Sequence, residues 1–162
     1  MSKEKGGMKI LAKNSSAYRD FQILEVVEAG MALRGTEIKS LRNQAPNLKE
    51  AFVEIRSTKG KVNVLEAWLV NCNIPHYIHG NIWNHEPTRD RKLLLHVYQI
   101  EKLYGEIIQK GMTVIPLKLY LKSGRAKVEL GLARGKKLVD KRETLKRKAV
   151  DREMDRAIKR KN

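Results

Sequence analysis

The sequence TVIPLKLYLKSGRAKVELGL, residues 113–132, is the clearest structural signal in the chain. Two runs in which apolar and polar residues alternate, 113–121 and 126–132, stand on either side of Lys122-Ser-Gly-Arg125. Gly124 can adopt a positive φ angle, as a tight turn requires. The pattern predicts an antiparallel β-hairpin with one face toward solvent.

Two further parts of the chain contain similar short β-like runs. Residues 21–27 read FQILEVV, and residues 62–65 lead toward a second apolar run at 68–70, with turn-forming residues between the runs. Short runs rich in valine, isoleucine and aromatic residues and bounded by turns are typical of strands. The sequence therefore predicts several short strands.

One segment has the periodicity of a helix. Between residues 98 and 110, apolar side chains recur at intervals of three or four positions, at Ile100, Leu103, Tyr104, Ile107 and Ile108. Gly111 follows directly, and glycine often ends a helix. The segment is therefore predicted to form one amphipathic helix that packs on the strands.

Short strands with one packed helix, and without a regular strand-helix alternation, indicate a fold that is mainly β with some α. We expect an OB-fold-like antiparallel β-barrel with a few short helices, an architecture that often binds nucleic acids. An α+β sandwich is the alternative. The chain of 162 residues has room for one domain and extensions. We predict a flexible basic leader at 1–13, the OB-fold-like barrel at 14–133 and a basic C-terminal tail at 134–162.

Positive charge is concentrated at the C-terminal end. Residues 134–162 hold 13 Lys and Arg against 5 Asp and Glu, a net charge of +8 out of +16 for the whole chain. Phosphates neutralise such a segment and release condensed counterions, so a nucleic-acid partner is expected. A membrane is the weakest alternative, because no apolar run approaches the thickness of a bilayer.

The same tail carries a weak helix pattern. Asp140 and Glu143 have the spacing of an N-cap residue and its acidic partner, and Asp155 and Lys159 stand four positions apart. Such side-chain pairs contribute only about 0.2–0.5 kcal/mol each, so an isolated helix would be marginal. We predict a tail that is disordered when free and becomes helical on RNA.

No catalytic or metal-binding constellation stands out in the sequence. The spacing of Cys72, His76, His79 and His85 matches no common zinc framework, and there is no Gly-rich phosphate loop or nucleophile elbow. We therefore expect no metal, no cofactor and no enzymatic activity. The lone cysteine and the lack of a secretory signal indicate a cytoplasmic protein.

The segment HEPTRDRKLLLH, residues 85–96, places three cations beside an apolar anchor. Arginine is suited to bidentate phosphate contacts and to stacking on bases. The alternative interpretation is a solvated basic loop that leads into the core. Aromatic side chains more often belong to a core, but three could offer stacking surfaces for bases. They are Tyr77, Trp83 and Tyr98.

Four blocks of the sequence, taken together and in order, closely resemble the SsrA-binding protein (small protein B) family of bacteria. They are EAG at 28–30, GTEIKSLR at 35–42, RDRKLLL at 89–95 and GKKLVDKR at 135–142. Asn14 lies ahead of the first block, and KGMTVIPL at 110–117 lies between the last two. Each block alone is a weak signal, but the set is specific and spans nearly the whole chain.

The resemblance implies an OB-fold barrel that binds the tRNA-like domain of transfer-messenger RNA. Family members deliver this RNA, charged with alanine, to ribosomes stalled on messages without a stop codon, a process called trans-translation. They are adaptors that support alanyl-tRNA synthetase and the aminoacyl-tRNA elongation factor, and they stand in for the missing anticodon arm. The implied partners are therefore transfer-messenger RNA and the ribosome, including small-subunit rRNA.

Three residues, Asn14, Glu28 and Leu94, match family positions implicated in binding the tRNA-like domain. Asn14 can donate and accept hydrogen bonds, and Glu28 can accept from a base amino group or a 2′-hydroxyl. Leu94 can pack beneath a displaced base, although a leucine triplet also fits a core strand. Phosphate contacts that position the RNA are expected from Lys39, Arg42, Arg89, Arg91 and Lys92.

The start of the tail matches the family segment that follows the empty messenger channel of the ribosome. The matching residues are Gly135, Lys136, Lys137, Asp140, Lys141 and Arg142. A flexible cationic tail could sense the vacant channel by becoming helical only when no message occupies it.

The sequence departs from the family pattern in three places. Val139 stands where relatives often have histidine or an aromatic residue, so a stacking role there is doubtful. No glycine occurs near Asn43-Gln44, which indicates a different turn. The segment 52–74 is several residues longer than in many relatives, with a loop at 57–61, and we expect it to alter a barrel rim and not the RNA surface.

Two other classes of function are alternatives. A structural ribosomal protein could bind rRNA with the same basic barrel and tail. An RNA-modifying or RNA-cleaving enzyme is disfavoured, because the sequence shows no catalytic constellation.

Overall fold

The computed structural model describes residues 7–136 and 138–161. Its centre is one sheet of seven strands in the order β1-β6-β7-β2-β5-β4-β3, and each neighbouring pair is antiparallel. The strands are β1 (Met8–Lys13), β2 (Phe21–Met31), β3 (Phe52–Ser57), β4 (Leu65–Val70), β5 (Arg91–Leu94), β6 (Thr113–Lys122) and β7 (Arg125–Gly135). The helices are α1 (Ala17–Asp20), α2 (Gly35–Asn43), η1 (Asn81–Trp83), α3 (Val97–Lys110) and α4 (Leu138–Lys161). The predicted fold, mainly β with a few helices, is confirmed.

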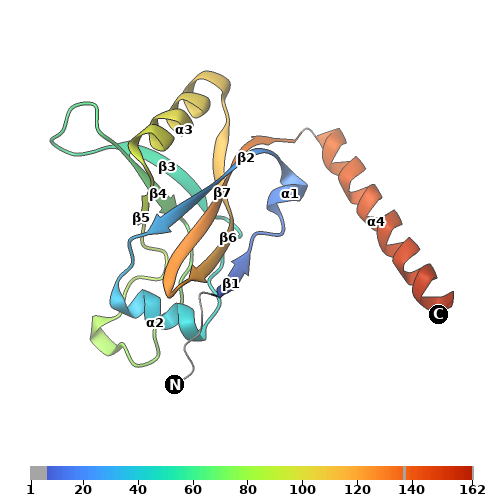
Figure 1. Cartoon of the computed structure of the whole chain (residues 1–162), viewed down its shortest axis with the longest axis horizontal. Coiled ribbons are helices and arrows are strands. Elements are labelled where there is room, and N and C mark those ends of the chain that lie inside the picture. Colours follow the sequence, from blue (N-terminus) through green and yellow to red (C-terminus); the bar gives the residue numbers. More distant parts are fainter. Residues whose placement is uncertain (1–6, 137, 162) are drawn as a thin grey trace.

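The sheet is curled into a partly closed barrel (Figure 1). Strand β3 lies at one end of the hydrogen-bonded order and yet packs against β6, which is next to the other end. The ladder still ends at β1 and β3, so the barrel is not fully closed. Because all the described strands belong to this one sheet, the barrel description fits better than a sandwich of two sheets.

The hairpin of β6 and β7 forms as the sequence predicts. Lys122 pairs with Arg125, and the two residues between them, Ser123 and Gly124, have φ angles of 52° and 77°. Two consecutive positive φ angles match the twist of the flanking strands in a two-residue hairpin turn. Strand β7 also pairs with β2 from Phe21 to Gly30, so this hairpin lies in the middle of the sheet.

The main core fills the interior of the barrel, and α3 packs on it. Leu119 of β6, Val128 of β7 and Leu69 of β4 are completely buried there. Helix α3 contacts β4 and β6 and buries Ile100 and Leu103. It ends at Gly111, which has a φ angle of 62°. The predicted amphipathic helix and its glycine stop are confirmed, with the helix beginning one residue earlier at Val97.

The structure corrects two boundaries. Met8–Lys13 is not part of a flexible leader but forms the edge strand β1, which pairs with β6 from Met8 opposite Lys122 to Lys13 opposite Lys118. The predicted strand at 62–65 begins only at Leu65. Val62 and Val64 lie in the exposed loop before it. Of the predicted leader, residues 1–6 lie outside the described part of the chain.

Candidate RNA-binding surface

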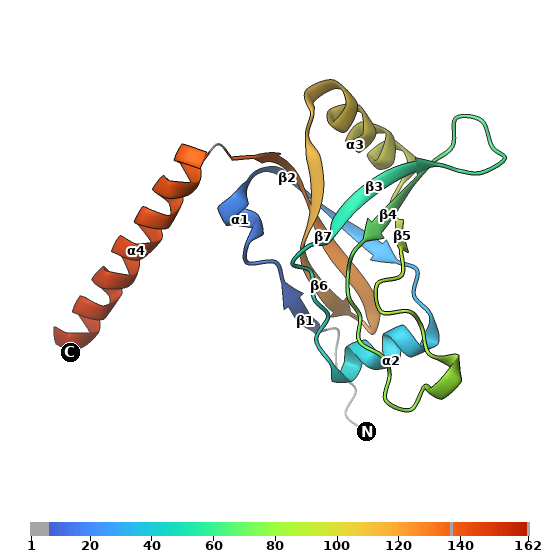
Figure 2. The same ribbon diagram turned by 180° about the vertical axis from the view of Figure 1, so that it is seen from behind.

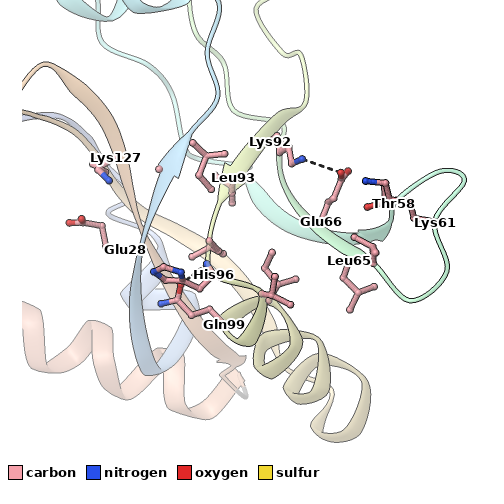
Figure 3. A pocket seen from close by; sticks show the side chains of 16 residues that line it. Glu28, Thr58, Lys61, Leu65, Glu66, Lys92, Leu93, His96, Gln99 and Lys127 are labelled. Carbon is pink, nitrogen blue, oxygen red and sulfur yellow. Dashed lines mark hydrogen bonds and ion pairs between the residues drawn. The ribbon is translucent and has the colours of Figure 1, made fainter.

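A hollow of about 710 Å³ opens where β2, β5 and β7 meet the β3–β4 loop and the start of α3 (Figure 3). We call it the sheet groove. Its lining combines apolar side chains with charges of both signs. The residues that matter for its chemistry are Glu28, Lys61, Glu66, Lys92, Leu94 and Lys127. Two of the residues implicated by the family resemblance, Glu28 and Leu94, are thus brought together with the predicted phosphate ligand Lys92.

Glu28 presents a partly anchored carboxylate in this groove. It lies on β2 opposite Glu129 of β7, and 42% of its side chain is exposed. The hydroxyl of Tyr120 donates a hydrogen bond to Oε2 of Glu28, and Nζ of Lys122 lies 3.9 Å from the same oxygen. Burial raises the pKa of Tyr120, and the bond to Glu28 raises it further, so Tyr120 remains a donor. Oε1 of Glu28 is therefore the atom able to accept from an amino group or a hydroxyl of a ligand.

Leu94 lies beside Glu28 as an exposed apolar side chain. It pairs with Gly30 across β2 and β5 and is 56% exposed, whereas its neighbour Leu93 is buried in the core. A Cβ atom at Gly30 would lie 3.3 Å from Cβ of Leu94, so glycine leaves room for the leucine to lie across β2. Of the two roles considered for Leu94, the structure excludes the core position and leaves the apolar surface.

The cations of the sheet groove come from three elements. Lys92 of β5 makes an ion pair of 3.1 Å with Glu66 of β4 (Figure 3). The hydrogen bond from Lys92 lowers the pKa of Glu66, which stays ionised. Lys127 of β7 and Lys61 of the β3–β4 loop also line the groove. Lys61 belongs to the long 52–74 segment, so this segment contributes to the lining of the groove, and the prediction that it leaves the RNA surface unaltered stays a prediction.

The predicted phosphate ligand Arg91 is not on the surface. Arg91 and Glu37 of α2 are both 0% exposed, and Nε of Arg91 donates to Oε1 of Glu37 at 3.0 Å. Its NH1 and NH2 groups donate to the backbone carbonyls of Cys72 and Pro87, at 2.5 and 2.9 Å. This burial corrects the assignment of Arg91 to a phosphate contact, because every bond of the guanidinium group is directed into the protein.

Arg89 belongs to the same cluster but lies at its edge. Its Nε and NH2 groups donate to the two carboxylate oxygens of Glu37 at 3.1 and 2.8 Å, and 24% of its side chain is exposed. The Glu37 carboxylate also accepts from the amide of Arg34 at 2.7 Å. Burial acts to raise the pKa of Glu37, but these bonds and the charge of Arg91 outweigh it and keep the pKa below its ordinary value. The cluster holds α2, β5 and the loop between β4 and β5 together.

Asn14 is a structural residue of the turn between β1 and α1. It is 7% exposed, and its Nδ2 donates to the carbonyl of Pro116 at 3.0 Å. Its Oδ1 accepts from the hydroxyl of Ser16 at 2.9 Å. These two bonds give Asn14 a structural role, and the direct RNA contact predicted for it stays a prediction. Its position is also separate from the sheet groove, whose lining does not include it in the described structure.

The last two predicted phosphate ligands, Lys39 and Arg42, are exposed on α2. Nζ of Lys39 lies 5.7 Å from the centroid of the Tyr77 ring, within the range of a cation–π contact. Neither residue lines the sheet groove as the structure describes it. The predicted set is therefore spread over the groove, α2, the buried cluster and the β1–α1 turn.

A family model described as "SmpB protein" matches residues 11–160 of the chain. The chain belongs to the SmpB protein family. Its curated relatives include the SsrA-binding protein of Enterococcus faecalis, 53% identical over 155 residues and 96% of each chain. The SsrA-binding protein of Thermosynechococcus vestitus is 52% identical over 153 residues, covering 94% of this chain and 96% of that one.

A solved structure is similar to most of this chain. It is described as tmRNA-SmpB on a journey to the center of the bacterial ribosome, and one of its chains matches with a TM-score of 0.63 and 44% sequence identity. The match covers 83% of this chain and 93% of that chain. The resemblance found in the four sequence blocks is thus confirmed as membership of the SmpB family.

The tail segment of this SmpB family member begins at the end of the barrel. Gly135 closes β7 opposite Phe21, and Lys136 donates from its amide to the carbonyl of Asp20 at 3.0 Å and from Nζ to the carbonyl of Tyr18 at 2.9 Å. Lys137 lies outside the described residues. Helix α4 contacts α1 at its start and extends away from the sheet (Figure 2). All side chains of α4 that the structure describes, including that of Arg142, are exposed.

Helix α4 begins at Leu138, two residues before the predicted N-cap at Asp140. The backbones of Asp140 and Lys141 are part of this helix, as is that of Val139. The prediction that the tail is disordered when free and helical on its RNA partner stays a prediction.

The missing glycine after α2 has a structural reason. The helix ends at Asn43, and Gln44 is extended, with a φ angle of −134°. Its Nε2 donates to the carbonyl of His76 at 3.0 Å. Since no positive φ angle is needed in this turn, a glycine offers no advantage, and a glutamine can tie α2 to the following loop.

Two of the four residues considered for zinc are buried. Cys72 is buried, and burial raises the pKa of its thiol to about 11. His85 is buried with its ring nitrogens 2.9 Å from the Thr36 hydroxyl and 2.9 Å from the carbonyl of Ile74. Within residues 7–136 and 138–161 no group of three metal-ligating side chains comes together. Nor does any helix in these ranges have the length and apolar character to cross a membrane.

Proposed function

We propose that this protein is an RNA-binding adaptor of trans-translation, which binds the tRNA-like domain of transfer-messenger RNA and delivers it to stalled ribosomes. The observation that carries the proposal is the sheet groove in a chain of the SmpB family. A carboxylate acceptor, an exposed leucine and two lysines lie there on neighbouring strands, and the β3–β4 loop adds a third lysine. These groups suit an RNA with an unpaired base over Leu94 and phosphates near the lysines.

The adaptor has no chemistry of its own in this proposal. It acts in the cytoplasm, holds the tRNA-like domain in a form that alanyl-tRNA synthetase and the aminoacyl-tRNA elongation factor accept, and then enters the ribosome. There the cationic tail lies along small-subunit rRNA and detects the empty messenger channel. Support for the last step comes from the net charge of +8 on residues 134–162 and from the projection of α4 away from the barrel (Figure 1).

Competition between two RNAs tests the proposal. Labelled tRNA-like domain of transfer-messenger RNA is bound to the protein and displaced by unlabelled ordinary tRNA across a salt series. We expect a preference for the tRNA-like domain that persists while salt weakens both complexes, because contacts to bases do not depend on counterion release. Equal affinities that fall together would instead favour a general basic RNA binder, such as a structural ribosomal protein.

Glu28→Ala should lower the affinity for the tRNA-like domain about tenfold, since a hydrogen bond to a charged group is worth roughly 1.5 kcal/mol or more. The variant also leaves the buried Tyr120 hydroxyl without its acceptor, so a small loss of stability is expected. Tyr120→Phe is the matched control, because it breaks the same internal bond and keeps the carboxylate. If both variants bind RNA equally weakly, Glu28 has a structural role only.

A further inference from the structure

Three large apolar side chains on one short loop face solvent. Ile78, Ile82 and Trp83 are 76, 87 and 83% exposed, and all lie within residues 75–85, which we call the Trp83 loop. Single apolar residues are common on protein surfaces, but a cluster of this size marks a site of interaction. As the structure describes it, the sheet groove includes none of them in its lining.

The Trp83 loop is closed by a pair of side-chain hydrogen bonds. Asn84 accepts from the amide of Tyr77 at 3.1 Å and donates to the carbonyl of Tyr77 at 2.6 Å. A Cβ atom at Gly80 would lie 2.6 Å from Nδ2 of Asn84, so this closure requires a residue without a side chain. The two hydrogen bonds between the Asn84 side chain and the backbone of Tyr77 therefore hold the tip of the loop in place.

Helix α2 supports the same loop from below. The hydroxyl of Ser40 donates to the carbonyl of Pro75 at 2.5 Å, and Nε2 of Gln44 donates to the carbonyl of His76 at 3.0 Å. At the other end of the loop, the buried His85 ring contacts the hydroxyl of Thr36 on α2. Two polar contacts to α2 and one to Gln44 directly after it give the loop a fixed position, so the exposure of Trp83 is a property of the folded surface.

The surroundings of the loop are cationic. Lys39 and Arg42 are exposed on α2, and Lys39 lies over the ring of Tyr77. Neither cation is in an ion pair with another described residue. An exposed indole beside unpaired cations matches an unpaired base and the phosphates that flank it. A purely apolar partner would leave these two charges without a counterpart.

A second hollow extends the sheet groove to α2. Gly30, Leu94 and Lys127 line both hollows, and the second one continues to Leu33 and to Ile38 of α2. Its volume is about 360 Å³. An RNA that occupies the sheet groove can therefore continue as far as Ile38 of α2, which is next to Lys39 in the chain.

From this arrangement we infer that the Trp83 loop and α2 form a second contact for the tRNA-like domain, in which Trp83 stacks on an unpaired base and Lys39 and Arg42 bind the adjacent phosphates. The inference rests on the proposed function and extends its RNA surface beyond the groove. Ile78 and Ile82 are exposed on the same loop and would add apolar surface for the bound RNA.

Fluorescence gives a direct test, because the chain has two tryptophans. Trp68→Phe leaves Trp83 as the sole indole, and stacking on a base should quench its emission when the tRNA-like domain is added. In affinity measurements Trp83→Ala should weaken binding about tenfold, while Trp83→Phe keeps most of the affinity. Ile108→Ala, an exposed apolar residue on α3, is the matched control and should bind normally. Removing Lys39 and Arg42 together should reduce the salt slope by about two.

Different results would contradict the proposed function and the contact at the Trp83 loop. If the wild-type protein does not prefer the tRNA-like domain over ordinary tRNA, the proposed function fails. If it does prefer it, but the Trp83 emission is unchanged and Trp83→Ala binds like the Ile108→Ala control, the inference is overturned. The same holds if Trp83→Ala loses only ribosome binding or self-association, because the loop would then serve another partner.

Discussion

A protein cut after Lys136 is expected to lose peptide tagging on stalled ribosomes by about 100-fold or more, which is the effect of losing two charge-assisted phosphate contacts of about 1.5 kcal/mol each. Its affinity for the tRNA-like domain should remain within about threefold, because distant sites contribute independently. The sheet groove and the Trp83 loop both belong to the barrel, whereas α4 extends away from it (Figure 2).

The place of the cut follows from the bonds of Lys136. Its amide donates a hydrogen bond to the carbonyl of Asp20, and its Nζ donates one to the carbonyl of Tyr18. These two bonds fix α1 to the end of β7. A cut before Lys136 would release these bonds and disturb α1, which covers the small second core of Ala17, Ile115, Leu117 and Ala133. A cut after Lys136 removes helix α4 and leaves the barrel intact.

Val150→Pro tests whether the tail must be helical. Val150 is exposed in the middle of α4, so no packing is lost, but proline there removes a backbone hydrogen bond and costs about 3 kcal/mol or more of helix stability. Tagging should fall for Val150→Pro and stay near normal for Val150→Ala, at equal affinity for the tRNA-like domain. Normal tagging by the truncated protein would rule out the proposed role of the tail, as would a collapse of its RNA affinity.

Elements that depend on local pattern could be predicted from the sequence. The β6–β7 hairpin and α3 are specified by alternation, periodicity and glycines within each segment itself. Strand β1 was missed because it is a short, Lys-containing edge strand whose only partner, β6, is about a hundred residues away in the chain. Short edge strands depend on such distant pairing for their stability.

Contacts with distant parts of the chain also decide the different positions of the two arginines in the basic segment 85–96. Arg89 and Arg91 are the same residue type two positions apart, and composition treats them alike. They differ because Glu37, more than fifty residues earlier in the chain, is fully buried and draws Arg91 into the core. Lys127 and Lys61 were not predicted, because no local pattern marks them as surface ligands. Only the fold of the sheet brings β7 and the β3–β4 loop together at the sheet groove.

Glu37→Ala is expected to destabilise the folded protein by about 3–5 kcal/mol, since it leaves the buried charge of Arg91 without its partner. For a chain of this size that corresponds to a fall in Tm of about 10 °C, measured by thermal unfolding. RNA binding should be weakened as well, because Arg91 is the first residue of β5, the strand that carries Lys92 and Leu94. Glu25→Ala is the matched control. It breaks an exposed ion pair with Lys102, so it should change stability by less than about 1 kcal/mol.

The pH dependence of stability gives a second readout of the same carboxylate. The folded state holds the pKa of Glu37 below the ordinary value of 4.5, despite burial, through Arg89, the Arg34 amide and Arg91. The stabilisation is therefore complete above pH 4.5 and is lost as the pH falls through the lowered pKa. The Tm of the wild-type protein should decline below about pH 4.5, and that of Glu37→Gln, which has no carboxylate to protonate, should decline less.

Removing both buried charges distinguishes the contribution of the Arg91–Glu37 ion pair from that of the hydrogen bonds between Arg91 and backbone carbonyls. In the double variant Glu37→Leu with Arg91→Met, no unpaired charge remains in the core, and Arg89 can turn its partly exposed guanidinium to water. The double variant should therefore be more stable than Glu37→Ala, because the cost of a broken buried pair is largely that of the charge left behind. If it is as unstable as the single variant, the carbonyls of Cys72 and Pro87 that Arg91 caps account for the loss, and the ion pair itself contributes little.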